Sequence, residues 1–237
     1  MNPAATRTDN LQKNRGAAAY AAGRPLAARL ANPQPGAVRA VKAVVFVVAL
    51  LPLARLVAGF FLDRLGANPI ELITRSTGTW TLTFLLITLA VTPLRRITGW
   101  HWLLRLRRML GLFAFFYAFL HLLTYAVLDR YLDFSGVWED VAKRPFITAG
   151  MAAFILMVPL AITSTKGWIR RLGRRWQLLH RLSYLSAIAA AVHYLWKVKI
   201  IGGSPVYYAL IIGALLAFRI VWPIWTRRPR PVALPPN

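Results

Sequence analysis

Six long runs of apolar residues, separated by short polar segments, dominate the chain. They lie at 43–62, 78–94, 109–128, 146–162, 176–196 and 205–225. Each is close to the length that an α-helix needs to cross the roughly 30 Å hydrocarbon core of a bilayer, and the second and fourth runs are the shortest. Because lipid offers no partner to an unpaired backbone group, such runs cross membranes as helices. The pattern predicts an all-α, polytopic membrane protein built as a bundle of six transmembrane helices.

The overall composition agrees with this interpretation. Hydrophobic residues make up 57% of the 237 residues and the mean hydropathy is +0.50, although the formal net charge is +23. A basic domain that binds nucleic acid spreads its charge over a folded surface and does not need long uncharged stretches. We therefore expect a multi-pass membrane protein with no nucleic-acid partner.

The charged residues alternate between the two sides of the predicted bundle. Segments 1–42, 95–108, 163–175 and 226–237 hold 20 of the 30 Lys and Arg residues. Six of the seven acids lie in the other connections: Asp63, Glu71, Asp129, Asp133, Glu139 and Asp140. Since cytoplasmic loops are enriched in Lys and Arg, both termini are predicted to be cytoplasmic.

This orientation divides the chain into three predicted parts. Residues 1–42 are expected to form a basic, disordered cytoplasmic tail that contacts anionic membrane lipid. Residues 43–225 would form the transmembrane domain, and residues 226–237 a second cytoplasmic tail rich in Pro and Arg. The outer face, with its six acids and the loop 129–144, is where we expect a partner protein to dock.

Three of the four histidines lie inside predicted spans, His121 on the third and His180 and His193 on the fifth. An ionisable side chain inside a span is costly and marks a functional site. The chain has no cysteine, which excludes thiolate metal sites, Fe–S clusters and covalent haem attachment. The spans hold no Asp or Glu away from their ends, which disfavours a di-iron cage, a zinc site and a carboxylate proton pathway. Two interpretations remain: a noncovalent haem held by neutral imidazoles, which we favour, and histidines that only form hydrogen bonds to neighbouring helices.

Depth in the membrane selects a pair of ligands. The third and fifth spans both run outward, and a helix rises about 1.5 Å per residue, so His121 and His193 differ in depth by roughly 8 Å and His121 and His180 by roughly 12 Å. We expect one haem between His121 and His193, in the outer half of the membrane. His180 would lie near the cytoplasmic side, where a second haem would need a partner at the depth of Arg107. On one ideal helix, His180 and His193 would point about 140° apart.

Arginines inside the apolar runs are expected to be structural. Arg55, Arg181 and Arg219 each lie close to the end of a span. Their stems can therefore cover apolar surface while the guanidinium groups reach the interface. Arg181, beside His180, is also a candidate partner for a haem propionate.

Several short segments between 107 and 199 resemble a known family. They are RRMLGL at 107–112, HLLTY at 121–125, KRPFIT at 143–148, TST at 163–165, LGRRWQLLH at 172–180 and VHYLWKVK at 192–199. These segments are similar to the MsrQ (YedZ) family of bacterial haem-binding membrane subunits, which belongs with the ferric-reductase-like transmembrane domains. Weaker similarity extends the resemblance to about residues 40–225.

The resemblance implies b-type haem on the third and fifth spans, with His121, His180 and His193 at the family's histidine positions. Two-haem relatives such as NADPH oxidases carry a second histidine on the third span, where this chain has Arg107, so one haem and two haems both remain open. The resemblance also implies an FMN cofactor, and electrons that enter from the quinone pool or a cytoplasmic flavin reductase. The acceptor would be a periplasmic molybdopterin sulfoxide reductase, the catalytic subunit of a heterodimer in the bacterial inner membrane.

On this reading the chain is an electron conduit with no catalytic residue of its own, because the chemistry on oxidised methionine takes place on the partner. Two alternatives remain. The first is the cytochrome b subunit of another membrane oxidoreductase or a ferric reductase. The second is a haem-free transporter that uses its histidines as polar contacts, although the chain lacks the paired broken helices typical of many transporters.

Overall fold

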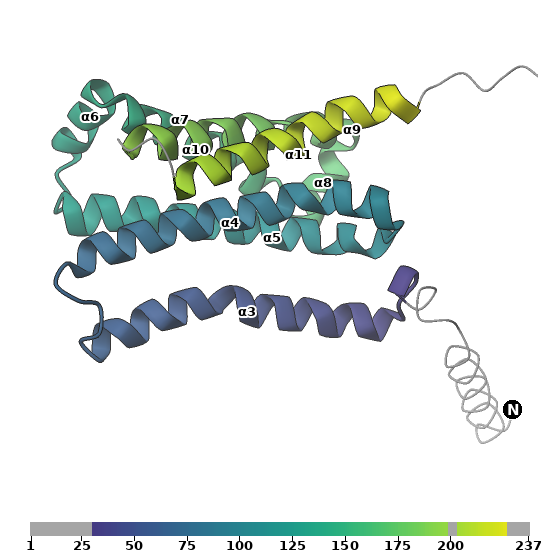
Figure 1. Ribbon diagram of the computed structural model, residues 1–237, viewed down its shortest axis with the longest axis horizontal. Helices are drawn as coiled ribbons and strands as arrows, with labels where there is room; N and C mark the ends of the chain where they lie inside the picture. Colours follow the sequence, from purple (N-terminus) through teal and green to yellow (C-terminus); the bar gives the residue numbers. More distant parts are fainter. Residues whose placement is uncertain (1–29, 199–202, 227–237) are drawn as a thin grey trace, which may run out of the picture.

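Long helices lying side by side build the molecule (Figure 1). The computed structural model describes residues 30–198 and 203–226. The long helices are α3 (Pro35–Phe61), α4 (Pro69–Thr98), α5 (Leu104–Thr124), α7 (Pro145–Ile162), α10 (Leu182–Lys197) and α11 (Ser204–Thr226). Short elements connect them: η1 (His101–Leu103), the π-helical η2 (Tyr125–Asp129), α6 (Phe134–Lys143), α8 (Lys166–Leu172) and α9 (Arg174–Leu179). Within these ranges there is no strand, which confirms the all-α prediction.

Five helical segments are long and apolar enough to cross a membrane: α3, α4, α5 with its flanking short helices, α7 and α11. The multi-pass prediction is therefore confirmed. The fifth predicted span differs from expectation, because it is two helices rather than one. α9 ends at Leu179 and α10 begins at Leu182, with a turn at His180 and Arg181 between them.

Local hydrogen bonds explain this break. The backbone N–H of Arg181 donates to the carbonyl of Leu178, three residues back, which tightens the chain. The hydroxyl of Ser183 donates a hydrogen bond to the carbonyl of His180 at 2.7 Å. Trp176 is tied outside its own helix, because its indole N–H donates to the carbonyl of Thr163 at 2.9 Å. Continuous α-helical bonding is therefore replaced over one turn, and the ideal-helix angle between His180 and His193 does not apply.

Helix α4 is much longer than the apolar run at 78–94 that predicted it. Its polar residues are largely threonines, and all of these except Thr92 donate their hydroxyls to the carbonyls four residues back and so need no water. Asn68 caps the beginning by accepting from the N–H of Glu71 at 3.2 Å, and Gly99 ends the helix in the left-handed conformation. A hydropathy pattern counts such threonines as polar, and the predicted span therefore begins nine residues after the helix does.

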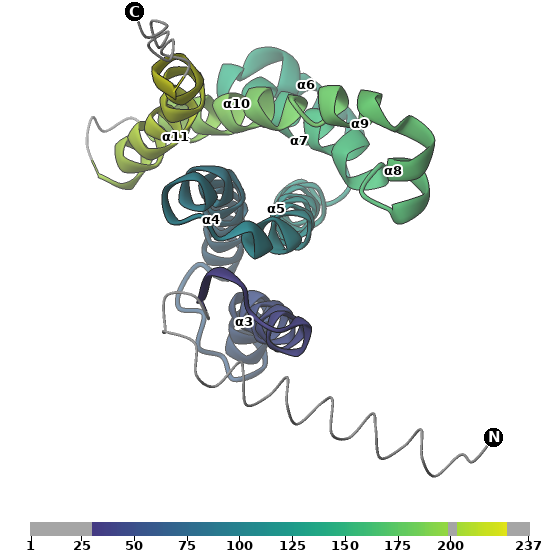
Figure 2. The ribbon, with the colours of Figure 1, turned by 90° about the vertical axis from the view of Figure 1, so that its right-hand side faces the viewer.

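The long helices pack as two pairs. α4 packs most closely on α5, and α7 packs most closely on α10, while α11 lies against α10 and α4. Viewed along the helices, α4 and α5 form a middle layer between α3 on one side and the α7, α10 and α11 group on the other (Figure 2). Small residues let α7 and α10 approach, since Ser186 is fully buried and its hydroxyl donates to the carbonyl of Ala153 at 3.0 Å.

Helix α3 is joined to this body through a buried tyrosine. Pro52 lies inside α3 and interrupts its hydrogen bonding, because proline has no N–H. The hydroxyl of Tyr117, on α5, bridges the next carbonyl and N–H along the helix: it donates to the carbonyl of Ala49 at 2.7 Å and accepts from the N–H of Leu53 at 3.3 Å. Tyr117 is fully buried, so this bridge satisfies backbone groups that lipid could not.

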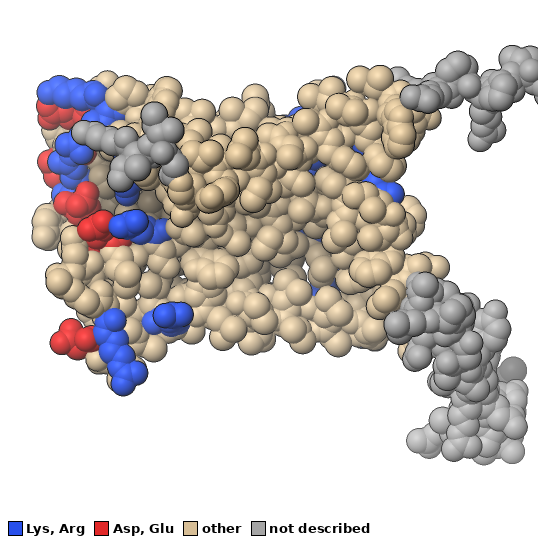
Figure 3. Space-filling view, in the orientation of Figure 1, with Lys and Arg blue, Asp and Glu red and all other residues tan. Residues whose placement is uncertain are grey.

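The two ends of the bundle carry different charges. The six acids of the described residues lie at one end, together with a few basic residues, and the face seen in Figure 3 carries little charge between the two ends. We call this the acidic end. The opposite end, formed by the α4–α5 connection, α8 and α9, carries Lys and Arg without an acid, and we call it the basic end.

Candidate functional site

Two histidines from different helix pairs face one another near the acidic end. His121 lies near the end of α5 and His193 near the end of α10. Their ring centroids are 6.1 Å apart and the ring planes are inclined by 75°. The structure thus brings together the two histidines that the depth argument selected, and it leaves His180 elsewhere.

Each ring is oriented by a backbone carbonyl of a neighbouring helix. Nδ1 of His121 donates to the carbonyl of Thr74, on α4, at 2.9 Å. Nδ1 of His193 donates to the carbonyl of Phe146, on α7, at 2.6 Å. Because a carbonyl can only accept, both protons must be on Nδ1, which leaves both Nε2 atoms as lone-pair donors. Neither Nε2 has a hydrogen-bond partner among the described residues. This is the arrangement by which proteins prepare imidazoles for a metal.

Two glycines make room for these rings. A Cβ atom at Gly78 would lie 3.1 Å from Nδ1 of His121, and one at Gly150 would lie 2.7 Å from Nδ1 of His193. Both distances are shorter than ordinary van der Waals contact, so a side chain at either position would displace the imidazole. Gly78 precedes His121 by 43 residues, and Gly150 precedes His193 by 43 residues. The sequence therefore gives no local signal that these glycines lie against the histidine rings.

The donor set fits a haem. Two imidazoles that bind opposite faces of one metal ion have centroids about 6 Å apart, because a metal–imidazole bond is about 2 Å long. No group of three or more His, Asp or Glu side chains lies close enough to hold a metal ion within the described residues. A metal bound here would have two protein ligands and would have to bring its remaining ligands with it, as the iron of a porphyrin does.

His180 and Arg107 define a second location, toward the basic end. The His180 ring stacks on Trp176 with centroids 3.8 Å apart, and its Nδ1 donates to the carbonyl of the same tryptophan at 3.0 Å. Its Nε2 is buried and has no partner in the part of the chain that the structure describes. Arg107 lies near enough to act on this ring electrostatically. No second imidazole faces His180 here, so the four candidate residues fall into two separate sites.

Arg219 was expected to snorkel to the interface, and that prediction is wrong. Its guanidinium turns inward, donating to the hydroxyl of Tyr184 at 2.5 Å and to the carbonyl of Leu89 at 2.7 Å. It also lies over the Tyr184 ring, 4.8 Å from the centroid. These contacts link α11 to α10 and α4 and give two nitrogens of the guanidinium an acceptor, while its Nε has no partner among the described residues. Only the position of a charged residue within an apolar run pointed to this role.

Comparison with known families and proteins adds a functional context. The family described as ferric reductase like transmembrane component matches residues 77–191, a segment that contains Arg107, His121 and His180 and ends two residues before His193. No solved structure matches the chain.

Several named relatives are similar over most of the chain. A protein of Herminiimonas arsenicoxydans is 50% identical over 206 residues, covering 86% of this chain and 94% of that relative. A protein of Azospira oryzae is 52% identical, covering 86% and 91% of the two chains, and one of Ralstonia nicotianae is 53% identical, covering 81% and 89%. All three are named protein-methionine-sulfoxide reductase heme-binding subunit MsrQ.

Proposed function

The chain belongs to the MsrQ family of protein-methionine-sulfoxide reductase heme-binding subunits, and from this premise we propose that it is a haem b electron-transfer subunit of the bacterial inner membrane. It would carry electrons outward to a periplasmic reductase that repairs oxidised methionine in proteins. The single observation that carries this proposal is the facing pair His121 and His193, with both Nε2 atoms free and both Nδ1 atoms held.

The residues of the acidic-end site would act as axial ligands and as their supports. His121 and His193 would bind the iron, while the carbonyls of Thr74 and Phe146 fix the tautomer and orientation of each ring and raise its basicity. When bound, the haem iron supplies reversible one-electron transfer at a potential that the protein sets. Lys197, whose ammonium acts electrostatically on both rings, is suited to pair with a propionate.

The basic-end site is proposed as the side where electrons enter. His180 offers a buried, unpartnered Nε2, and Arg107 contributes positive charge beside it. These two residues would hold a second haem or its propionates. The donor we propose is the quinone pool or a cytoplasmic flavin reductase. FMN as a further cofactor is proposed from the family resemblance alone.

The acceptor we propose is a periplasmic molybdopterin sulfoxide reductase, which forms a heterodimer with this chain. Its docking surface would be the acidic end, which includes α6 and the residues around it. Residues 43–225 would act as the haem-binding domain. The expected cytoplasmic tails fall largely outside the described residues, except that α3 already begins at Pro35, within the expected tail 1–42.

A ferric reductase, or the cytochrome b subunit of another oxidoreductase, is the second candidate, and the family match over residues 77–191 favours it. Such a protein would use the same histidines, so haem content does not separate the two functions. Electron transfer to the periplasmic reductase is the measurement that distinguishes them.

The first experiment is the absorbance spectrum of the full chain purified in detergent, oxidised and reduced, with haem counted per chain. We expect a Soret band that shifts on reduction and sharp α and β bands, as two axial imidazoles produce. A chain that stays colourless after expression with ample haem would remove the electron-transfer proposal. Reoxidation of the reduced chain by the periplasmic reductase plus protein methionine sulfoxide, but not by ferric chelates, would favour the first candidate over the second.

A further inference from the structure

One carboxylate at the acidic end is buried, although it lies on a short surface helix. Asp140, on α6, is 6% exposed and is the buried acid of the described residues. The acid next to it in the chain, Glu139, has a side chain that is 58% exposed and pairs with Lys143 at the surface. Burying a carboxylate is costly unless it is paired and hydrogen-bonded, so the surroundings of Asp140 need an explanation.

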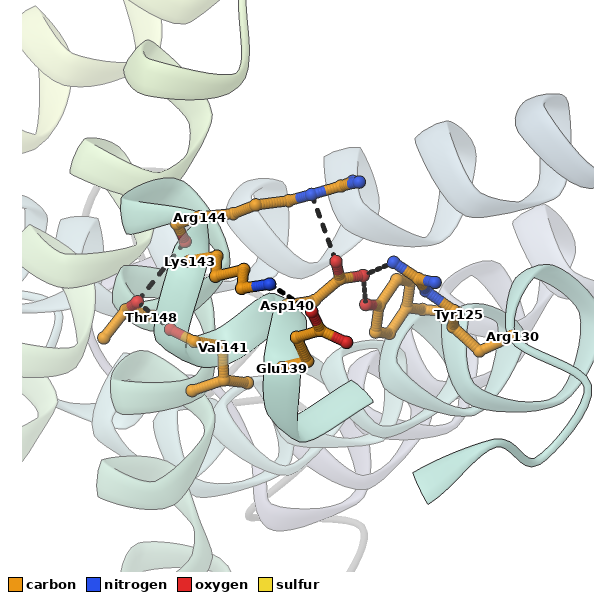
Figure 4. Close-up of polar contacts among 8 residues, drawn as sticks. All are labelled: Tyr125, Arg130, Glu139, Asp140, Val141, Lys143, Arg144 and Thr148. Atoms are coloured by element: carbon orange, nitrogen blue, oxygen red, sulfur yellow. Dashed lines mark hydrogen bonds and ion pairs between the residues drawn. The ribbon is translucent and has the colours of Figure 1, made fainter. Parts of the chain in front are cut away.

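Three side chains converge on this carboxylate (Figure 4). The hydroxyl of Tyr125 donates to Oδ2 at 2.5 Å, and Arg130 donates to the same oxygen. Nε of Arg144 lies 3.1 Å from Oδ1. Both oxygens are thus used, and hydrogen bonds to a charged group are among the strong ones. Asp140 is therefore a buried, hydrogen-bonded charge and not a solvated one. We call Asp140 with Tyr125, Arg130 and Arg144 the node.

The contacts of Asp140 connect the helical run that carries His121 to the helix that supports the His193 ring. Tyr125 follows His121 by four residues in the continuous helical run of α5 and η2, so it lies one turn further along the same face. Arg144 immediately precedes Pro145 and Phe146 at the beginning of α7. The carbonyl of Phe146 is the group that orients the His193 ring. One carboxylate thus holds the His121 helix through Tyr125 and the His193 support through Arg144.

A second contact fixes the same junction. The hydroxyl of Thr148 donates to the carbonyl of Val141, on α6, at 2.5 Å, which ties the first turn of α7 to the turn of α6 that follows Asp140. The segment KRPFIT at 143–148, one of the segments that carried the family resemblance, thereby acquires a physical role. It transmits the placement of Asp140 to the carbonyl that the His193 ring needs.

We propose that Asp140 is the positioning residue of the haem site. Its carboxylate sets the angle between the two axial imidazoles and, as a fixed negative charge, lowers the midpoint potential of the iron they bind. The inference rests on the proposed function, because it needs a haem between His121 and His193. The sign follows from charge: the ferric state is the more positive one, so a buried negative charge favours it. Removal of this charge also leaves Arg130 and Arg144 uncompensated, which shifts the potential in the same direction.

The test compares Asp140→Asn with Glu139→Gln in the full, haem-loaded chain. Both variants lose one formal negative charge, at adjacent positions, but only the first loses a buried one. For Asp140→Asn we expect the equilibrium constant for reduction of the haem to rise about tenfold. For a one-electron couple this is a positive shift of the midpoint potential by about 59 mV. We also expect an altered electron paramagnetic resonance spectrum of the low-spin ferric state, because its g values depend on the angle between the imidazole planes. Glu139→Gln should match the wild type, and a wild-type potential and spectrum in Asp140→Asn would overturn the proposal.

A second variant decides the case in which Asp140→Asn retains no haem. Tyr125→Phe removes one hydrogen bond from the node without changing any charge, and it should alter the resonance spectrum with a smaller shift in potential. A wild-type spectrum in Tyr125→Phe, alongside a haem-free Asp140→Asn, would show that Asp140 serves folding alone and would overturn the positioning role. Failure of the proposed function is a distinct result, since the wild-type chain itself would then lack the Soret band.

Discussion

The two histidine sites of this protein are built in different ways. At the acidic end, His121 and His193 belong to different helix pairs, and each ring is held by a carbonyl of yet another helix. At the basic end, the His180 ring is held by a neighbour in the sequence, through the carbonyl and the ring of Trp176 four residues back. The His121 and His193 rings are thus oriented by tertiary contacts, whereas the His180 ring is oriented by a local one. A preorganised pair of ligands is therefore expected at the acidic end, and a more adaptable site at the basic end.

The strongest way to break this comparison is to remove a ligand from the acidic-end site. His121→Ala or His193→Ala should each leave less than about a tenth of the wild-type haem, since even changes behind the ligands cost about 10–100-fold in metal affinity. Haem per chain after purification measures the effect. His101→Ala, which changes an exposed histidine of η1, is the control and should keep full haem. Full haem in either ligand variant would refute the axial assignment.

Gly78 and Gly150 give a second test of the acidic-end site, because they contact the histidine rings and do not bind the haem themselves. Gly150→Ala should weaken haem binding by about 10–100-fold, the range for changes behind a ligand, since the new Cβ would lie 2.7 Å from His193 Nδ1. Gly78→Ala, with its longer distance of 3.1 Å, should have a smaller effect. Haem titration of the purified variants would measure both. Gly213→Ala, where a Cβ meets nothing within 4 Å, is the matched control, and equal affinities for all three variants would contradict the role of Gly78 and Gly150 in making room for the rings.

The basic-end site should tolerate the loss of its histidine better. His180→Ala should keep the low-spin spectrum of the acidic-end site and lose no more than one haem of two, because no contact of His121 or His193 passes through His180. Haem content and the reduced-minus-oxidised spectrum measure this. Glu71→Gln, a surface change at the opposite end, serves as control. Complete loss of haem in His180→Ala would show that the two sites are not independent.

The smallest expected effect concerns the scaffold beside the basic-end site. Arg219→Gln should lower the free energy of unfolding by about 1.5–3 kcal/mol, the range for hydrogen bonds to a charged group, since it removes the links from α11 to Tyr184 and Leu89. Thermal unfolding in detergent would measure the change. Arg55→Gln removes the same charge from an exposed position on α3 and should change little. Equal stabilities would mean that the inward contacts of Arg219 contribute nothing.

Much of the fold could be predicted from the sequence, because lipid imposes long apolar helices. The predicted run at 146–162 matches α7 within one residue. The beginning of α4 could not be predicted from hydropathy, since its threonine hydroxyls are satisfied inside the helix. The break at His180 and Arg181 was also missed, because both sides of it are apolar and the cause is a set of tertiary and turn contacts.

The candidate site was also predictable only in part. The residue types and their depth pointed to His121 and His193, since few ionisable groups occur in the spans. The supports of these rings were not predictable, because Thr74 and Phe146 contribute only backbone carbonyls, which every residue has. Asp140 was counted among the outer acids, and only its burial distinguishes it from Glu139.

The division of the bundle into two helix pairs has a consequence for how the protein is made. His121 belongs to the α4 and α5 pair and His193 to the α7 and α10 pair, so a group that both rings bind closes the seam between the pairs. A ligand that binds only the assembled form stabilises that form in proportion to the logarithm of its concentration. Newly inserted chains would therefore mature in step with haem supply. In a cell short of haem, the assembled form would lose this stabilisation, and the amount of folded subunit would follow the cofactor.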